Sequence, residues 1–308
     1  MQSNFFLQTS KKHRFDDFAL KSIADTELKQ LIEVYISNMT EVLYVVQSSF
    51  NLMVHAKLQE TASKIFERNR MLAYADSLRG DYSDDEQRIY KDAKERTEHQ
   101  IAGEGFEKYD ILSTVTSILN ELEKDKVIEV SNFSTLRQSI VIVWSATESL
   151  IRDVVRIKIN KDGVLASGFF ESNLTSPYWQ KKQVSFDHLK SYSFDLSKNM
   201  GDVALSINSC SNLSSMRSAF SYIFGTGSRS YKELKSRDIY ILYKLRNLIA
   251  HRNGIIDEKY KNETKCDGNV GEIVSVLPDE FTMCFEASKR LALCLLQELS
   301  NKPSQGAP

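Results

Sequence analysis

Residues that interrupt helices are scarce in this chain, which has only 4 prolines and 12 glycines among its 308 residues. Long segments carry apolar side chains at three- and four-residue steps instead of alternating apolar and polar residues. Because such steps match the period of an α-helix, they favour helices over strands. The sequence therefore predicts an all-α protein.

Cysteine is also scarce, and the spacing of the cysteines argues against two structural roles. Cys210, Cys266, Cys284 and Cys294 form no CxxC pair, and no histidine stands at metal-ligand spacing from them. Structural zinc sites need closely spaced ligands, and stable disulfides belong to oxidising compartments. We therefore expect reduced thiols in a cytosolic protein and no metal.

Neither sign of charge predominates, because 40 lysines and arginines accompany 41 aspartates and glutamates. Without a bulk positive field, any contact with nucleic acid must come from a local basic patch. The chain also shows no glycine-rich phosphate loop, no HExxH motif and no paired-carboxylate metal motif. These absences argue against an ATPase, a protease or a metal-dependent nuclease, and we expect no cofactor.

Long apolar runs are missing as well. The first residues, MQSNFFLQTSKKHRFDDF, lack the basic-then-apolar order of a signal peptide. The most apolar early stretch, Val42 to Val54, includes polar residues and falls short of the roughly 20 apolar residues that a membrane span needs. We therefore expect a soluble, cytoplasmic protein without a membrane partner.

The helical segments fall into two regions and a tail. Residues 1–130 are predicted to form an N-terminal helical region of unknown role, residues 131–300 a second domain, and residues 301–308 a disordered tail. The charged tract from Asp81 to His99 is interpreted as a solvated helix face, with a flexible excursion as the alternative. The main predicted helices are one or two over Asp25 to about Arg70, one over about Tyr109 to Lys124, a long helix from Asn132, and one each over Tyr231 to Asn253 and Asp279 to Leu299.

One charged residue falls on the apolar face of a predicted helix. On a helical wheel of the segment closed by Gly254, Arg246 lies within an apolar arc. The arc comprises Ile239, Leu242, Leu245, Ile249 and Ala250. A polar stripe beside it comprises Tyr240, Lys244, Asn247 and His251. Guanidinium, carboxamide and imidazole groups therefore converge near one helix end.

This combination suits cleavage of RNA by its own 2′-hydroxyl group. That reaction needs a fixed cation for the crowded phosphate and a group that titrates near neutrality to move a proton, and it needs no metal ion. A structural interpretation fits the same spacing, because an arginine can pair with a buried acid and a histidine is favourable near a helix C-terminus. The wheel by itself leaves both interpretations open.

The run RDIYILYKLRNLIAHRNGIID resembles the signature of the HEPN superfamily and is similar to that of its RiboL-PSP-HEPN group, with an arginine, four to six residues, and then a histidine. The matching positions are Arg246, Asn247, His251, Gly254 and Asp257. The upstream segment RQSIVIVWSATESLIRDVV resembles the first helix of the same domain, with Glu148 where relatives often hold an acidic or polar residue. The resemblance covers residues 132–299, about half the chain.

The resemblance implies a HEPN-like bundle of four to five helices that forms a homodimer with one composite cleft. In active relatives the arginine and histidine support metal-independent RNA cleavage that leaves a 2′,3′-cyclic phosphate. Arg246 would therefore hold the phosphate and His251 would assist proton transfer. Asn247 would orient one of these two side chains.

The resemblance also suggests supporting residues. By its place in the pattern Glu148 would pair with Arg246, and the alternative is a solvent-facing glutamate beside Arg152. The residues that would steer the RNA backbone are Lys244, Arg252 and Lys259, unless they are ordinary solvated cations. The two tryptophans, Trp144 and Trp179, are interpreted as packing residues.

In one place the sequence departs from the family pattern. HEPN toxins that are silenced by nucleotide transfer carry a tyrosine two residues after the histidine. Asn253 stands at that position here, although Tyr260 lies nearby in the sequence. Control by that modification is therefore not expected.

Two functional hypotheses follow. The first is a metal-independent endoribonuclease that cuts cellular RNA such as tRNA, as a toxin or anti-phage effector of abortive infection, with an antitoxin or trigger protein as partner. The second is a non-catalytic HEPN-like scaffold that binds RNA or nucleotide, dimerises, and docks a partner through its N-terminal helices. As a third hypothesis, the N-terminal region senses an infection signal and gates the nuclease. A charge inside an apolar arc favours the enzyme, since a scaffold has no evident need of it.

Overall fold

The computed structural model describes residues 23–79, 86–102, 108–122, 124–179 and 184–300. Across these residues every regular element is a helix, apart from an isolated bridge between Ile255 and Ile273. The prediction of an all-α fold is confirmed. No helix within these ranges is long and apolar enough to cross a membrane. The tail predicted to be disordered, residues 301–308, lies outside the described residues.

The chain divides into two compact units. Among the described residues, one unit holds those as far as Val46 and those from Phe133 to Ser300, and the other holds those between Gln47 and Asn132. The sequence placed residues 1–130 in one region, whereas the first half of helix α2 (Thr26–Arg79) groups with the C-terminal helices. The cause is a buried apolar stripe on that half of α2. Its members are Leu28, Ile32, Tyr35, Met39 and Val42.

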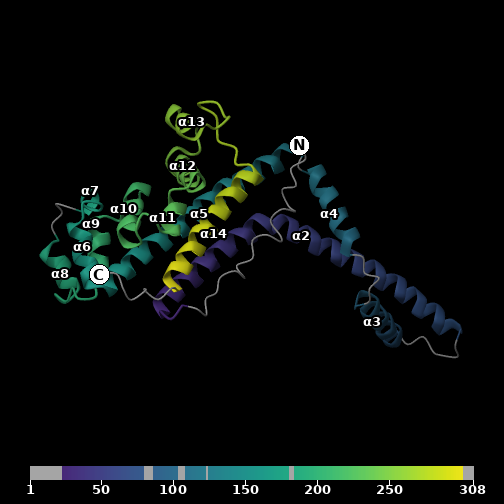
Figure 1. Ribbon diagram of the computed structural model, residues 1–308. Coiled ribbons are helices and arrows are strands. Elements are labelled where there is room, and N and C mark those ends of the chain that lie inside the picture. Colours follow the sequence, from purple (N-terminus) through teal and green to yellow (C-terminus); the bar gives the residue numbers. More distant parts are fainter. Residues whose placement is uncertain (1–22, 80–85, 103–107, 123, 180–183, 301–308) are drawn as a thin grey trace. The chain divides into compact units, whose positions relative to one another are not determined.

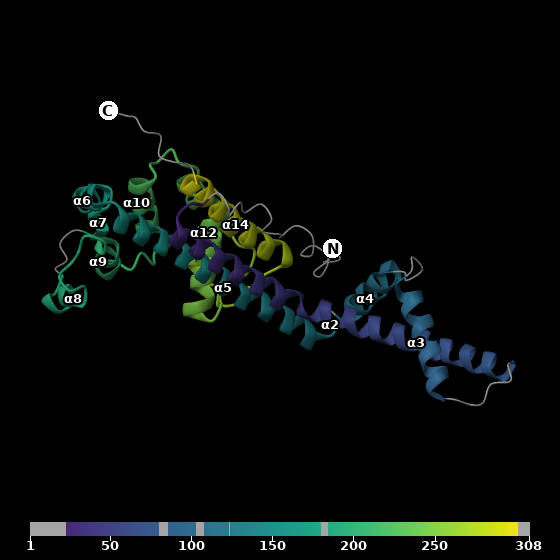
Figure 2. The same cartoon turned by 90° about the horizontal axis from the view of Figure 1, so that it is seen from below.

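Three long helices form the centre of the first unit. They are the first half of α2, α5 (Lys126–Lys161) and α14 (Pro278–Ser300), which lie side by side in both views (Figures 1 and 2). α5 starts before the predicted Asn132, because the Asp125 carboxylate accepts a hydrogen bond from the Val127 N–H at 2.8 Å and caps the helix. The shorter helices of this unit are α6 (Gly163–Glu171), α7 (Ser176–Trp179), α8 (Phe186–Ser191), α9 (Met200–Ile207), α10 (Leu213–Ile223), α11 (Arg229–Leu234), α12 (Arg237–Arg252) and α13 (Glu258–Thr264).

A chain of buried hydroxyl groups joins the three long helices. The Tyr35 hydroxyl lies 2.7 Å from Ser288 Oγ, and Ser288 Oγ lies 2.6 Å from Thr147 Oγ1. Thr147 donates its proton to the Val143 carbonyl at 2.7 Å, so its oxygen must accept from Ser288. Ser288 must then accept from Tyr35. Hydrogen-bond donation therefore runs in one direction from α2 through α14 to α5.

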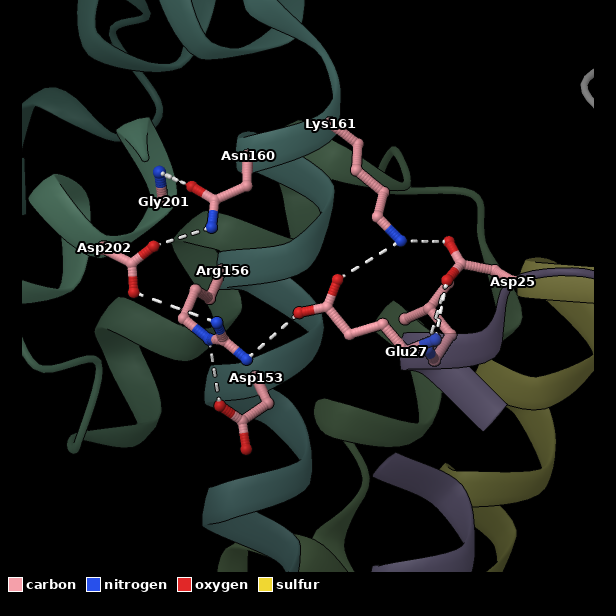
Figure 3. A network of polar contacts seen from close by, with 9 residues as sticks. Asp25, Glu27, Asp153, Arg156, Asn160, Lys161, Gly201 and Asp202 are labelled. Atoms are coloured by element: carbon pink, nitrogen blue, oxygen red, sulfur yellow. Dashed lines mark hydrogen bonds and ion pairs between the residues drawn. The ribbon is translucent and has the colours of Figure 1, made fainter. Parts of the chain in front are cut away.

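A second polar network joins the start of α2 to the end of α5 and to α9 (Figure 3). Lys161 pairs with Asp25 at 2.5 Å and with Glu27 at 3.4 Å. Arg156 contacts Glu27 at 3.4 Å and Asp202 at 3.9 Å. Burial raises the pKa of Asp25, but Lys161 and backbone N–H groups lower it by a larger amount. The pKa of Asp25 therefore lies below its ordinary value. Because these side chains are partly exposed, the pairs position the helices more than they stabilise them.

The second unit holds the rest of α2, α3 (Glu86–Ala102), α4 (Lys108–Leu122) and the start of α5 as far as Asn132. Polar contacts join α2 to α3: Asn69 donates to Thr97 Oγ1 at 3.1 Å, and Arg96 pairs with Asp76 at 3.0 Å. The described part of the charged tract lies in α3, where Ala93 and Thr97 are buried and most other side chains are exposed. The interpretation as a solvated helix face is confirmed there, and the first five residues of the tract lie outside the described ones.

We expect Ser288→Ala to destabilise the protein by about 1–3 kcal/mol, because it leaves the buried Tyr35 hydroxyl without an acceptor. Urea denaturation followed by circular dichroism measures this change. Ser145→Ala is the matched control, since Ser145 is exposed and donates to its own helix, to the Val141 carbonyl. Equal unfolding midpoints for the two variants would mean that the hydroxyl chain contributes nothing.

Candidate functional site

The helix that carries the candidate residues is shorter than predicted. The expected single helix from Tyr231 to Asn253 is wrong, because the chain breaks between α11 and α12. Ser236 Oγ accepts a hydrogen bond from the Ile239 N–H at 3.3 Å and caps the start of α12. The prediction overlooked the preference of serine side chains for backbone groups at helix starts.

Two successive left-handed residues close the end of α12. Asn253 and Gly254 have left-handed backbones, with φ of 53° and 79°, and the Gly254 N–H donates to the Leu248 carbonyl at 3.0 Å. The prediction of Gly254 as the C-terminal cap is off by one residue, because the capping residue is Asn253, whose N–H also donates to the Leu248 carbonyl. The Gly254 carbonyl accepts from the Val274 N–H at 2.8 Å, so the segment around Val274 holds the helix end that carries His251.

A groove of about 660 Å³ lies along α12 and collects the predicted residues. Its lining includes the candidate catalytic residues Arg246, Asn247 and His251, and the candidate RNA-binding residues Lys244, Arg252 and Lys259. Lining residues to which the sequence assigned no part in the site include Ser211, Asn212, Tyr243 and Glu263. Tyr243 lies on α12 itself, one helical turn before Asn247, so helical spacing could have indicated it. No motif or spacing marks the other three, because only folding brings the start of α10 and the end of α13 to α12.

Arg246 is held at the wall of this groove, with its side chain 23% exposed. Its Nη1 donates to Asn247 Oδ1 at 2.8 Å, and its Nη2 lies 3.6 Å from Glu148 Oε2. The predicted pairing of Glu148 with Arg246 is therefore present. Of the apolar arc around Arg246, only Ala250 is exposed, contrary to prediction, while the other four members are buried. The Nε atom of Arg246 is buried and has no hydrogen-bond partner among the described residues.

Glu148 is itself fixed by a residue whose polar role the sequence did not suggest. Trp144 is fully buried, and its indole N–H donates to Glu148 Oε2 at 2.8 Å, the same oxygen that lies nearest Arg246. The Trp144 ring also packs on Tyr243 of the groove, with ring centroids 5.0 Å apart. Trp144 is therefore more than a packing residue. Glu148 is 13% exposed and faces α12, so the alternative of a solvent-facing glutamate is wrong.

Two of the three candidate RNA-binding cations are paired with carboxylates of the same chain. Lys244 Nζ lies 2.5 Å from Glu263, and Arg252 Nη1 lies 2.5 Å from Asp257. Burial lowers the pKa of Lys244, but Glu263 and Tyr240 raise it by more, so the ammonium group stays charged. Lys259 is exposed and has no ion-pair partner in the part of the chain that the structure describes. The groove thus contains positive charge that is largely balanced internally.

His251 lies on the same groove wall, one helical turn beyond Asn247, and its side chain is exposed. No hydrogen bond or ion pair engages its imidazole within the described ranges, so both ring nitrogens are accessible to a ligand. A guanidinium fixed on two sides can hold an anion, and an accessible imidazole can move a proton. The arrangement therefore has the groups for acid–base chemistry on a phosphodiester.

The described residues contain no cluster of histidine, cysteine, aspartate and glutamate that would hold a metal ion. Burial raises the pKa of the Cys210 thiol to about 12 and raises that of Cys284 as well, so neither forms a thiolate at neutral pH.

Comparison of the chain with known protein families, curated proteins and solved structures finds no match. The HEPN resemblance therefore depends on the sequence motif and remains a prediction. The functional argument must come from the groove itself.

We expect a double-mutant cycle of Glu148→Ala and Arg246→Ala to give a coupling energy on the order of 1–2 kcal/mol, because each single change leaves a partly buried partner unpaired. Urea unfolding of the wild type, both single variants and the double variant measures it. Additive losses of stability would show that the 3.6 Å contact contributes no interaction energy.

Proposed function

We propose that this protein is a metal-independent endoribonuclease whose active site is the groove along α12. The observation that carries the proposal is the placement of Arg246 and His251 on one groove wall, with Arg246 oriented by Asn247 and Glu148. A purely structural arginine paired with a buried acid would not need an accessible imidazole beside it.

In the proposed reaction Arg246 binds a non-bridging oxygen of the scissile phosphate. The 2′-hydroxyl loses its proton to a base and attacks phosphorus, the bond to the 5′-oxygen breaks, and that oxygen takes up a proton. The products are a 2′,3′-cyclic phosphate and a 5′-hydroxyl. Preorganised donors at the developing negative charge are worth several kcal/mol to such a step.

The proton transfers support a homodimer. The reaction needs one group that accepts a proton and one that donates a proton. The groove of one chain is lined by a single histidine, His251, and its two carboxylates, Asp257 and Glu263, are paired with cations. A second copy, placed so that two α12 helices face one composite cleft as the HEPN resemblance implies, would supply the second imidazole. The same resemblance suggests a toxin or anti-phage effector acting on cellular RNA such as tRNA, with an antitoxin or trigger protein as partner.

A second candidate function is a non-catalytic scaffold that binds RNA or nucleotide. The pairing of Lys244 with Glu263 and of Arg252 with Asp257 favours it, because paired cations attract phosphate weakly. Cleavage itself separates the two functions.

We expect the wild-type protein to cleave total RNA or tRNA in excess EDTA and to leave cyclic-phosphate ends. His251→Ala should lower the rate by about 10²–10⁴-fold, the usual contribution of a general acid or base. Arg246→Ala should also lower it. Gel electrophoresis of the fragments, with analysis of their end groups, measures all three.

His99→Ala is the matched control, because His99 is an exposed histidine on α3 and does not line the groove. It should cleave like the wild type. Equal cleavage by His251→Ala, or loss of cleavage in EDTA, would contradict the proposal. RNA that stays intact with every variant would favour the scaffold.

A further inference from the structure

Two carboxylates at the ends of one short helix, α13, neutralise cations of the groove. Glu263 lies at the end of α13 and pairs with Lys244, while Asp257 precedes α13 and pairs with Arg252, each at 2.5 Å. All four residues line the groove. Two carboxylates therefore lie in contact with the cations that an RNA phosphate would approach.

The backbone of α13 is firmly attached to the first unit, so these carboxylates do not belong to a loose segment. The Arg237 guanidinium at the start of α12 donates to the Glu263 carbonyl at 3.0 Å and to the Thr264 carbonyl at 2.7 Å. At the other end, Asp257 caps α13 by accepting from the Tyr260 N–H at 2.6 Å, and the Tyr260 side chain is buried. The two carboxylate side chains are thus held beside the groove, and each cation becomes free only when its ion pair breaks.

We infer that Glu263 and Asp257 determine the affinity of the groove for phosphate by occupying Lys244 and Arg252 in the absence of RNA. This inference rests on the proposed function for the identity of the ligand. A lysine that binds a carboxylate must give up that bond before it binds a phosphate, so the energy of the new contact is offset by the energy of the lost one. Lys259, which is exposed and has no ion-pair partner within the described ranges, can bind a phosphate without breaking an ion pair.

The two ion pairs differ in how far their cations are buried. Lys244 is partly buried, with 20% of its side chain exposed, and a tyrosine ring, that of Tyr240, lies 5.4 Å from its ammonium group. Arg252 is 58% exposed and therefore better screened by solvent. Release of Lys244 should consequently change phosphate affinity more than release of Arg252.

The test measures binding separately from cleavage. The probe is a fluorescein-labelled 2′-O-methyl oligoribonucleotide, which has no free 2′-hydroxyl to attack the phosphate, and fluorescence anisotropy is followed as a function of salt. Glu263→Gln should bind about fivefold more tightly at roughly 0.1 M salt, and the slope of log Kd against log salt should steepen by about 0.7, as expected for one added phosphate contact.

Two further variants sharpen the result. Asp257→Asn keeps the helix cap, because asparagine caps as well as aspartate, and removes only the charge beside Arg252, so it should tighten binding by a smaller factor. Glu258→Gln is the matched control, since Glu258 is an exposed carboxylate in the first turn of α13, outside the groove lining and without an ion-pair partner among the described residues. It should bind like the wild type.

Equal affinities for Glu263→Gln, Glu258→Gln and the wild type would overturn the inference, as would the absence of probe binding by every variant. Cleavage of unmodified RNA is measured in parallel. Tighter binding by Glu263→Gln without any cleavage would uphold the role of the carboxylates and reject the nuclease. Unchanged binding by Glu263→Gln together with cleavage would uphold the nuclease and reject the role of the carboxylates.

Discussion

The site depends on one constraint, which is that Arg246 carries a permanent charge on a helix face that is otherwise mostly buried. A partly buried guanidinium without a counter-charge costs several kcal/mol, so α5 must present a carboxylate to it. Glu148 supplies this group, and Trp144 fixes the carboxylate by donating its indole N–H to the oxygen nearest Arg246. This contact, together with the one to Asn247, fixes the direction in which Arg246 points.

The same contact explains why the arginine remains useful to a ligand. Arg246 has five N–H donors, and its neighbours engage only part of them. Asn247 and Glu148 restrict the side chain to one orientation, which lowers the entropy cost of binding an anion. A fixed cation beside an accessible imidazole is the combination that acid–base chemistry on a phosphodiester requires. The carboxylates of Asp257 and Glu263 neutralise two nearby cations, Arg252 and Lys244, and so oppose the attraction of a phosphate to the groove.

Helix α2 belongs to both compact units of the chain. Helical periodicity runs along α2 without interruption, and nothing in that pattern indicates where one set of neighbours gives way to another. The hydrogen-bond partners of α2 distinguish its two parts. Tyr35 bonds to Ser288 of α14, whereas Asn69 bonds to Thr97 of α3. Such contacts join residues far apart in the sequence, which helical periodicity cannot reveal.

The sequence alone determined those features of this protein that depend on interactions between residues close together in the chain. The scarcity of helix breakers and the steps of three and four residues indicated the all-α class, and Gly254 marked the end of α12 to within one residue of the Asn253 cap, because these effects act within a few residues. The position of Arg246 in an apolar arc predicted that an acid would be needed, and the motif indicated Glu148. Only the tertiary structure decided that Trp144 fixes that acid, that Ser211 and Asn212 line the same groove, and that Lys244 and Arg252 are already paired. Each of these features depends on distances between separate helices, which are set by packing of the whole unit and leave no periodic signal in the chain.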